Sequence, residues 1–392
     1  MESKSLHRKP IDEQLNEINV KRYETLDELK LASRDNSGKY PKSKYPRSGT
    51  EELSLLERKV GNMFDLDSSK IVVFTYGMAA VVAAIESASP TSGTIILHGK
   101  NEYSNNKKYI NNTLSKRQII NVETDSYNIE KLEGIIEEKK PGIIFLESIA
   151  NGPDMPVLDL NRFFEIKYIK NNKPLIIIDN TLAAGLISPK EILERDLNVI
   201  GVESGFKFYT LHRTSFGFLY SNNNDLINSI KEYRRQTGTA PDLPQTKLIS
   251  SKLIGRWELL QRNSTIYKNT KIIASICNDI CNENSKFVIS HPNLKNNQTF
   301  DFVNKKFANG ASPLFFINPK KGVDQFDIAE ALLNNGVLSE SCRIIESFGY
   351  DFTAIWPNSD MNFVRISPGT EKEEDAIKIG SAMKESLRKF TD

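Results

Sequence analysis

The stretch Leu175-Ile-Ile-Ile-Asp-Asn-Thr181 decides the fold class, because it is an apolar run of strand length that stops at a polar turn. Short β-branched runs of the same kind recur before and after it, with helical stretches between them. Strands that alternate with helices predict βαβ crossovers, and therefore an α/β protein whose mostly parallel sheet is covered on both faces. The expected strands are 71–75, 93–97, 118–122, 142–147, 175–179, 198–202 and 215–220.

The pattern changes after about Leu248. A long helix is expected over 254–280, and a smaller α+β unit after it. Its expected strands are 313–317 and 362–366 and its helices 325–334 and 371–389, and residues 298–309 are expected to form a loop. We therefore divide the chain into an N-terminal arm (1–60, with one helix over 18–31), a large domain (61–250) and a C-terminal α+β domain (251–392).

Composition excludes several classes of protein. Of the 392 residues 26% are charged and the formal net charge is +2, so no basic stripe for nucleic acid is expected. Three cysteines, Cys277, Cys281 and Cys342, favour a reducing compartment over a disulfide framework, and the first two are expected on one helix face. The four histidines have no zinc-ligand spacing. Without an apolar run of membrane length, we expect a cytoplasmic protein.

Two residues suggest a specific chemistry. Asp179 ends the run quoted above, and Lys207 lies in the later run Val202-Glu-Ser-Gly-Phe-Lys-Phe-Tyr209. A lysine forms a Schiff base with pyridoxal phosphate (PLP), and an acid keeps the cofactor's ring nitrogen protonated. The ordinary explanation is that Asp179 is a turn residue and Lys207 a solvated lysine. The pair alone does not decide between the two.

Other polar residues follow successive expected strands, and they agree with a cofactor site. Gly77 and Met78 open a helix, where free backbone N–H groups suit a phosphate. Tyr103 can stack on a ring, Asn151 can reach a phenolic oxygen, and Ser204 can add a hydroxyl to the phosphate. Each residue has a structural explanation when taken alone. Together they follow the carboxyl ends of the strands, where α/β sheets bind ligands.

The order of these motifs resembles that of the Cys/Met-metabolism PLP enzymes, from about Tyr45 to Lys389. This family includes cystathionine gamma-synthase, cystathionine gamma- and beta-lyases and methionine gamma-lyase. The matching segments are Tyr45-Pro-Arg-Ser-Gly49, Gly77-Met-Ala-Ala80, Glu147-Ser-Ile-Ala-Asn151, Asp179-Asn-Thr181, Ser204 with Lys207, Arg262, Glu346-Ser-Phe-Gly349 and Arg365-Ile-Ser367. The resemblance implies fold type I, the PLP-dependent aminotransferase-like fold.

The resemblance also implies a role for each matched residue. Lys207 would carry the cofactor and act as the base, and Tyr103 would stack on the ring and serve as acid or base near the leaving group. The other implied cofactor contacts are Asp179, Gly77, Met78, Ser204, Asn151 and, from a neighbouring subunit, Tyr45 and Arg47. The implied substrate contacts are Arg365 at the α-carboxylate, Ser347, Asn151 and Glu346. Glu346 would hold a distal ammonium, unless it is a solvated helix-end residue.

The sequence departs from the family pattern around the substrate. Phe206 replaces a phosphate-binding threonine, so Thr75 or Tyr76 would have to supply that hydroxyl. Ser104-Asn-Asn106 replaces the usual Gly-Gly-Thr or Gly-Cys-Thr after the tyrosine. The segment between Phe348 and Arg365 is shorter than in the family, so part of the substrate-access loop is missing. These changes suggest an unusual substrate.

The resemblance therefore implies γ-elimination or γ-replacement on a γ-substituted L-amino acid, with Lys207 as the central residue. Two alternatives stay open: β-elimination by a carbon–sulfur lyase, and a PLP-fold protein that has lost turnover and serves in binding or assembly. The expected partners are an amino-acid substrate and further copies of this chain, as a dimer of dimers. No metal, nucleic acid or membrane is expected to bind.

Overall fold

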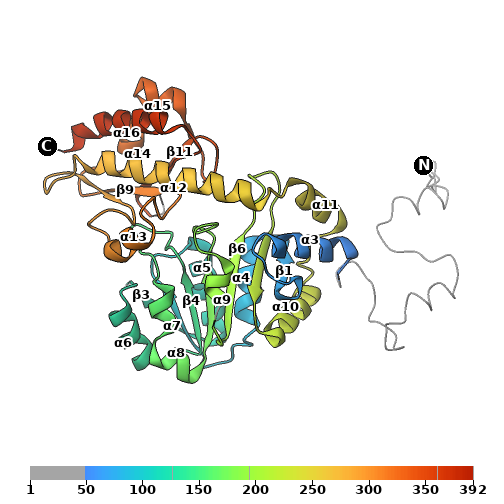
Figure 1. The fold of residues 1–392 in the computed structure, drawn as a ribbon. Helices are drawn as coiled ribbons and strands as arrows, with labels where there is room; N and C mark the ends of the chain where they lie inside the picture. The colour runs from blue at the N-terminus through green and yellow to red at the C-terminus, as the bar shows by residue number, and fades with distance from the viewer. Residues whose placement is uncertain (1–48, 126, 194, 360, 392) are drawn as a thin grey trace, which may run out of the picture.

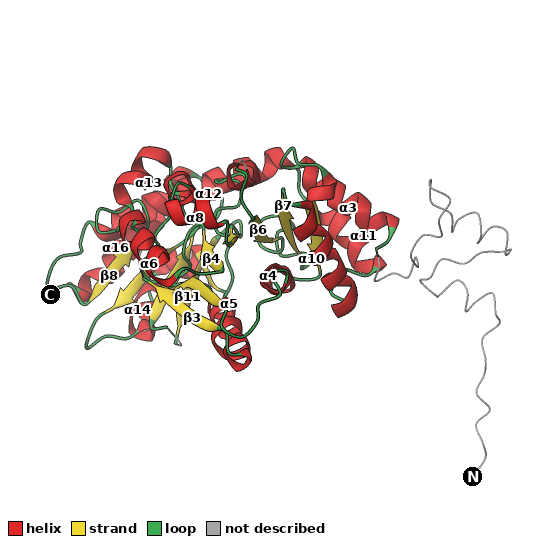
Figure 2. Ribbon diagram, turned by 90° about the horizontal axis from the view of Figure 1, so that it is seen from below, coloured by secondary structure: helices red, strands yellow, loops and turns green. Residues whose placement is uncertain are grey.

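The computed structural model describes residues 49–125, 127–193, 195–359 and 361–391, and it contains two β-sheets (Figure 1). The expected helix over 18–31, together with Tyr45 and Arg47, lies outside the described residues. In both views α3 (Glu51–Asn62), α10 (Asn224–Thr237) and α11 (Leu243–Lys252) lie together at one end of the molecule (Figures 1 and 2). The smaller sheet lies at the other end, with α16 (Glu373–Leu387).

The large sheet has seven strands in the order β1-β7-β6-β5-β4-β2-β3. Only β7 runs antiparallel to its neighbours, so the sheet is mostly parallel, as the sequence predicts. All seven expected strands are present, with ends moved by a few residues. Their bounds are β1 Ile71–Phe74, β2 Ile95–Gly99, β3 Ile120–Thr124, β4 Ile143–Glu147, β5 Leu175–Asp179, β6 Val199–Ser204 and β7 Gly217–Ser221.

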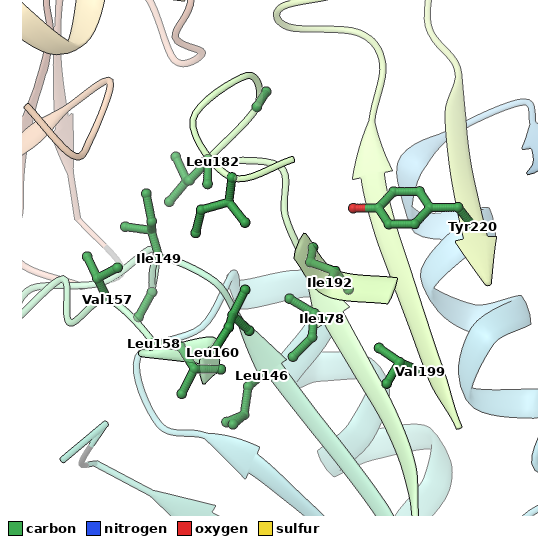
Figure 3. Packing of buried hydrophobic residues seen from close by; sticks show 14 of the residues in the cluster. Leu146, Ile149, Val157, Leu158, Leu160, Ile178, Leu182, Ile192, Val199 and Tyr220 are labelled. Atoms are coloured by element: carbon green, nitrogen blue, oxygen red, sulfur yellow. The ribbon is translucent and has the colours of Figure 1, made fainter. Parts of the chain in front are cut away.

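Both faces of this sheet are buried, because successive side chains of a strand point to opposite sides. In β4, Ile144 and Leu146 join one apolar cluster while Ile143 and Phe145 join another. The first cluster also holds Ile178, and Figure 3 shows Leu146 and Ile178 within it. Its covering helices are α6 (Ile129–Lys139), α7 (Leu160–Phe164), α8 (Lys167–Asn172), α9 (Pro189–Leu193) and α3, whereas α4 (Gly77–Glu86) and α10 cover the opposite face.

The smaller sheet has five strands in the order β10-β11-β12-β9-β8. The sequence predicts two of them, β9 (Phe315–Pro319) and β12 (Phe363–Ser367), and both are present. The prediction misses β8 (Phe287–Ser290), β10 (Cys342–Ile344) and β11 (Thr353–Asn358). Helices α14 (Gln325–Leu333), α15 (Gly336–Ser341) and α16 contribute to the apolar core of this sheet.

The long helix α12 (Arg256–Asn278) joins the two units and agrees with the helix expected over 254–280. Near its start, Asn263 Nδ2 donates to Ala184 O at 2.6 Å in the large unit. Near its end, Ile273 and Cys277 belong to the core of the smaller sheet. The helix therefore packs against both units and connects them.

Two expectations about the C-terminal part are wrong. Residues 298–309 are not a continuous loop, because α13 (Phe300–Lys306) lies within them and buries Val303. Cys277 and Cys281 do not share a helix face, because α12 ends at Asn278 and Cys281 lies beyond the turn that follows the helix. Both cysteines are free thiols. None of the helices in the described ranges is long and apolar enough to cross a membrane.

A buried ion pair ties α3 to the edge of the large sheet. Arg234 Nη1 on α10 lies 2.6 Å from Glu57 Oε1 and 2.7 Å from Val73 O. Val73 N donates to the same carboxylate at 3.2 Å. The side chains of Glu57 and Arg234 are 9% and 7% exposed, so removal of one charge leaves the other buried without a counterion.

Substitution of Glu57 by glutamine is expected to lower the free energy of unfolding by about 3–5 kcal/mol. Urea denaturation of the purified variant measures this loss. Glu51→Gln is the matched control, because Glu51 lies exposed at the start of the same helix and should change stability by less than about 1 kcal/mol. Equal stability of the two variants would show that the Glu57–Arg234 pair contributes little.

Candidate active site

A cavity of about 610 Å³ opens at the carboxyl ends of the large sheet, where the smaller unit meets it. The sequence-predicted residues that line it are Gly77, Met78, Tyr103, Asn151, Asp179, Ser204, Lys207, Glu346, Ser347 and Arg365. Tyr45 and Arg47 lie outside the described residues. The cavity therefore gathers residues from widely separated parts of the chain.

Strand register brings the acidic and hydroxyl residues to one edge of the sheet. β4, β5 and β6 run parallel, with Glu147 opposite Asp179 and Asp179 opposite Val202. Ser204 ends β6, two residues beyond Val202. Because parallel strands end at the same edge, Glu147, Asp179 and Ser204 all line the same cavity.

Lys207 lies in the turn after β6, and its amine is surrounded by protein groups. Its Nζ is 4.1 Å from the centre of the Phe348 ring and 5.6 Å from that of Tyr103. Burial removes water from the ammonium and lowers the pKa of Lys207 to about 8, although the negative charge of Asp179 opposes this shift. A lysine with such a pKa has a substantial neutral fraction near neutral pH, and the neutral amine is the nucleophilic form.

The lowered pKa predicts how Lys207 reacts with acetic anhydride in cofactor-free protein. Because the amine is neutral above its pKa, its labelling rate should reach half of its plateau near pH 8. A free lysine peptide, added as an internal standard, should reach half of its plateau only near pH 10.4. Peptide mass spectrometry across pH gives both curves, and curves that rise together would contradict the lowered pKa.

Asp179 is held by two donors. Thr181 N donates to its Oδ1 at 3.0 Å, and Asn106 Nδ2 donates to its Oδ2 at 3.3 Å. Asn106 Nδ2 also lies 3.4 Å from Glu147 Oε1, so one buried amide contacts both carboxyl groups. Sequence reasoning assigned Asn106 no role; its only signal was its place in the segment that departs from Gly-Gly-Thr.

Glu147 lines the cavity and also holds two of the loops around it. Its Oε1 accepts from Tyr103 N at 2.8 Å, and its Oε2 accepts from Asn151 N at 2.7 Å. Burial, and the neighbouring charge of Asp179, raise the pKa of Glu147 to about 8. The contacts of this residue fix the backbone at two of the predicted site residues, which the sequence did not indicate.

Alanine in place of Asn106 is expected to lower kcat about tenfold, because the carboxylate of Asp179 loses one of its hydrogen-bond donors. The KM for the amino acid should change much less. Asn111→Ala is the matched control, because Asn111 contacts only exposed groups away from the cavity. Steady-state kinetics of both variants tests this role, and an unchanged kcat in the Asn106 variant would exclude it.

The start of α4 offers backbone donors to an anion. Tyr76 is its N-cap without a side-chain cap, which leaves N–H groups of the first turn free of such a partner. A Cβ on Gly77 would lie 3.0 Å from Cβ of Ser204, so glycine permits this helix end to approach β6. Of the two hydroxyls expected to stand in for the family's threonine, Tyr76 lines the cavity; Thr75 is not among the described residues that line it.

Phe206 takes part in an aromatic contact between the two units. Its ring lies 4.7 Å from that of His212, which lies 4.1 Å from that of Tyr350. His212 Nε2 is also 3.2 Å from Ser347 Oγ. Burial lowers the pKa of His212 to about 4, so the ring is neutral at neutral pH. This contact fixes Ser347 and Phe348 above Lys207.

Arg365 lies on β12 with its guanidinium in the cavity. Its Nε and one terminal nitrogen are buried and have no hydrogen-bond partner among the described residues. Burial lowers the pKa of Arg365 to about 10, which leaves it a cation at neutral pH. A fork of unpaired donors at the end of a cavity suits a carboxylate.

Comparison with known proteins agrees with this geometry. A model of the Cys/Met metabolism PLP-dependent enzyme family matches residues 22–378. The chain belongs to this family.

Individual relatives are distant. Cystathionine beta-lyase of Saccharomyces cerevisiae is 22% identical over 345 residues, which cover 84% of this chain and 71% of that protein. The cystathionine gamma-synthase structure from Xanthomonas oryzae pv. oryzae covers 91% of each chain with a TM-score of 0.71 and 17% identity. A putative O-acetylhomoserine (thiol)-lyase structure from Campylobacter jejuni, which contains a pyridoxyl-lysine phosphate, covers 93% of this chain and 92% of its own with a TM-score of 0.70 and 20% identity. These structures share the fold of this chain.

Membership in the Cys/Met-metabolism family makes PLP the cofactor, and the fold is type I. The cavity has the groups that this cofactor requires. It offers an amine of lowered pKa at Lys207, a fixed carboxylate at Asp179 and a helix N-terminus at Gly77. It also retains unpaired buried donors at Arg365 for a carboxylate.

Proposed function

We propose that Lys207 carries PLP and that the protein eliminates or replaces a group on the γ-carbon of an L-amino acid. The observation that carries this proposal is the placement of the Lys207 amine close to the rings of Phe348 and Tyr103, in one cavity with Asp179 and the unpaired donors of Arg365. PLP, when bound, withdraws electrons from the substrate carbon that loses its proton.

The chain's own residues supply binding and proton transfer. Arg365 binds the α-carboxylate and so fixes which bond at Cα is presented for cleavage. The Lys207 amine, once free, takes the proton from Cα and moves a further proton from Cβ when the leaving group is on Cγ. Tyr103, whose hydroxyl accepts from Asn105 Nδ2 at 3.0 Å, serves as acid or base at the leaving group.

The remaining predicted residues complete the site. Asp179 keeps the ring nitrogen protonated, the start of α4 with Met78 and Ser204 binds the phosphate, and Asn151 contacts the phenolic oxygen. The hydroxyls of Thr214 and Ser215, which also line the cavity, bind the phosphate in place of the hydroxyl that Phe206 does not have. Ser347 binds on the substrate side, and Glu346 receives a distal ammonium.

Subunit assembly belongs to the same proposal. Tyr45 and Arg47, which precede α3 in the chain, are proposed to bind the cofactor phosphate of a neighbouring subunit in a dimer of dimers. We place the enzyme in the cytoplasm, where its free thiols stay reduced.

A second candidate is β-elimination at a carbon–sulfur bond. The name of the 22% identical yeast relative, cystathionine beta-lyase, favours it. Because β-elimination needs only the first proton transfer at Cα, the same residues serve both reactions.

A substrate screen of the PLP-loaded protein separates these functions. Cystathionine, O-acetyl- and O-succinyl-homoserine, homocysteine, methionine and cysteine are supplied singly and with a thiol, and 2-oxo acid, ammonia and replacement products are measured. Products with the γ-bond broken support the proposal. Products of β-cleavage alone favour the second candidate, and no product with any amino acid indicates a scaffold without turnover.

A further inference from the structure

Arg213 is a cation of the cavity that the family pattern does not explain. It lines the same cavity as Lys207 and is exposed. Its guanidinium makes no hydrogen bond or ion pair with any residue in the described ranges. The neighbouring acid, Asp351, already has two partners. It forms an ion pair with Arg262 and accepts a hydrogen bond from the hydroxyl of Thr370 at 2.9 Å. The positive charge of Arg213 helps to lower the pKa of Asp351, but its guanidinium has no direct partner among the described residues and stays available to a ligand in the cavity.

The backbone of Arg213 is held in place. The two residues before it, Leu211 and His212, have φ of 50° and 62°, a conformation that costs free energy in residues other than glycine. His212 is fixed between Phe206 and Tyr350, and Arg213 N donates to Thr210 O at 3.0 Å. Arg213 thus lies where the turn of Lys207 meets the segment Glu346–Asp351.

Two cations lie at different depths of one cavity. Arg365 is half-buried and has two buried, unpaired donor nitrogens for the α-carboxylate, whereas Arg213 is exposed. Glu346 also lines the cavity and is exposed, so a distal anion is expected to avoid it and to bind at Arg213. An ammonium on the same distal group, where present, would face Glu346.

We infer that Arg213 binds an anionic group at the far end of the substrate side chain. The substrates are then amino acids whose departing group carries a carboxylate or a similar anion. This inference rests on the proposed function, because it requires an amino acid bound with its α-carboxylate at Arg365.

Binding of two amino acids without a leaving group tests the inference apart from turnover. L-2-Aminosuberate and L-2-aminooctanoate have the same chain length and differ in their ends, a carboxylate and a methyl group. Isothermal titration of the PLP-loaded enzyme gives their Kd values for wild type, Arg213→Gln, Arg213→Lys and Arg162→Gln. Arg162 is the control, because it is exposed and pairs with Glu130 on the surface.

The wild type is expected to bind the carboxylate-ended amino acid about tenfold to a hundredfold more tightly than the methyl-ended one. Arg213→Gln should abolish this preference without weakening the methyl-ended ligand, Arg213→Lys should keep part of it, and Arg162→Gln should keep all of it. An equal loss for both ligands, or weaker PLP binding in Arg213→Gln, would overturn the inference, because Arg213 would then serve the cofactor or the loop. Equal binding of both ligands by the wild type would overturn the inference about Arg213 but leave the proposed function standing. If neither ligand binds, the proposed function and this inference both fall.

Discussion

Replacement of Lys207 by alanine is expected to reduce amino-acid turnover by about 10⁴-fold or more. The variant loses the amine whose pKa is lowered by burial, and with it both the attachment of the cofactor and the base that moves the proton at Cα. It should also lose the visible absorbance band of the attached cofactor. Turnover of the best substrate from the screen, measured with PLP in excess, gives the size of the loss.

Lys170→Ala is the matched control for this result. Lys170 is exposed, pairs with Glu165 on the surface and lies away from the cavity. Its removal should leave turnover and absorbance unchanged. A Lys207→Ala protein that keeps more than about one tenth of wild-type turnover would contradict the role of Lys207, provided that its circular dichroism spectrum is that of the folded protein.

Replacement of Arg365 by alanine is expected to raise the KM for every amino-acid substrate by about 30-fold or more, because the α-carboxylate loses its buried partner. The effect should be independent of the side chain of the substrate, since every amino acid has this carboxylate. Steady-state kinetics with two substrates that differ in their distal group measures it. Arg365→Lys should recover only part of the loss, because lysine keeps the charge without the fork of donors.

Arg343→Ala provides the comparison for Arg365. Arg343 lies on β10 in the smaller sheet, is exposed and donates to backbone carbonyls of its own segment. It should leave KM unchanged. A rise in KM for one substrate only, or equal values in the two alanine variants, would show that Arg365 does not bind the α-carboxylate.

The architecture of the large unit could be predicted from the sequence because its strands are buried on both faces. A strand such as Leu175–Asp179 is a continuous apolar run, and the polar residue that ends it marks the ligand-binding edge. The smaller sheet was harder to predict, because the apolar pattern of its missed strands is weaker. β10 has three residues, two of them exposed, and β11 contains a proline and ends on partly exposed residues.

The helix α13 illustrates a different limit. Residues 298–309 contain Asn and Thr, which favour a loop, but Val303 and Phe307 are buried against the large unit. Packing between distant segments decided the local structure there. Local propensity does not include such contacts, so this part of the fold could not be predicted from the sequence pattern.

The site was predictable where its residues directly follow strands, and it was not where distant loops meet. Lys207, Asp179 and Ser204 line the cavity as the order of the strands suggested. The contact of His212 with Ser347 joins residues 135 positions apart, and Asn106 reaches Asp179 across 73 positions. No spacing in the sequence predicts either of these contacts. The position of Arg213 in the cavity could not be predicted from the sequence for the same reason.

Reduction of the PLP-loaded protein with borohydride, followed by peptide mass spectrometry, tests most directly that Lys207 carries the cofactor. Reduction makes the lysine–cofactor bond permanent, so the attached residue can be identified. The expected result is a pyridoxyl phosphate adduct on the peptide that contains Lys207, which disappears when a substrate amino acid is added before reduction. An adduct on another lysine, or none at all, would contradict the assignment of this cavity as the active site.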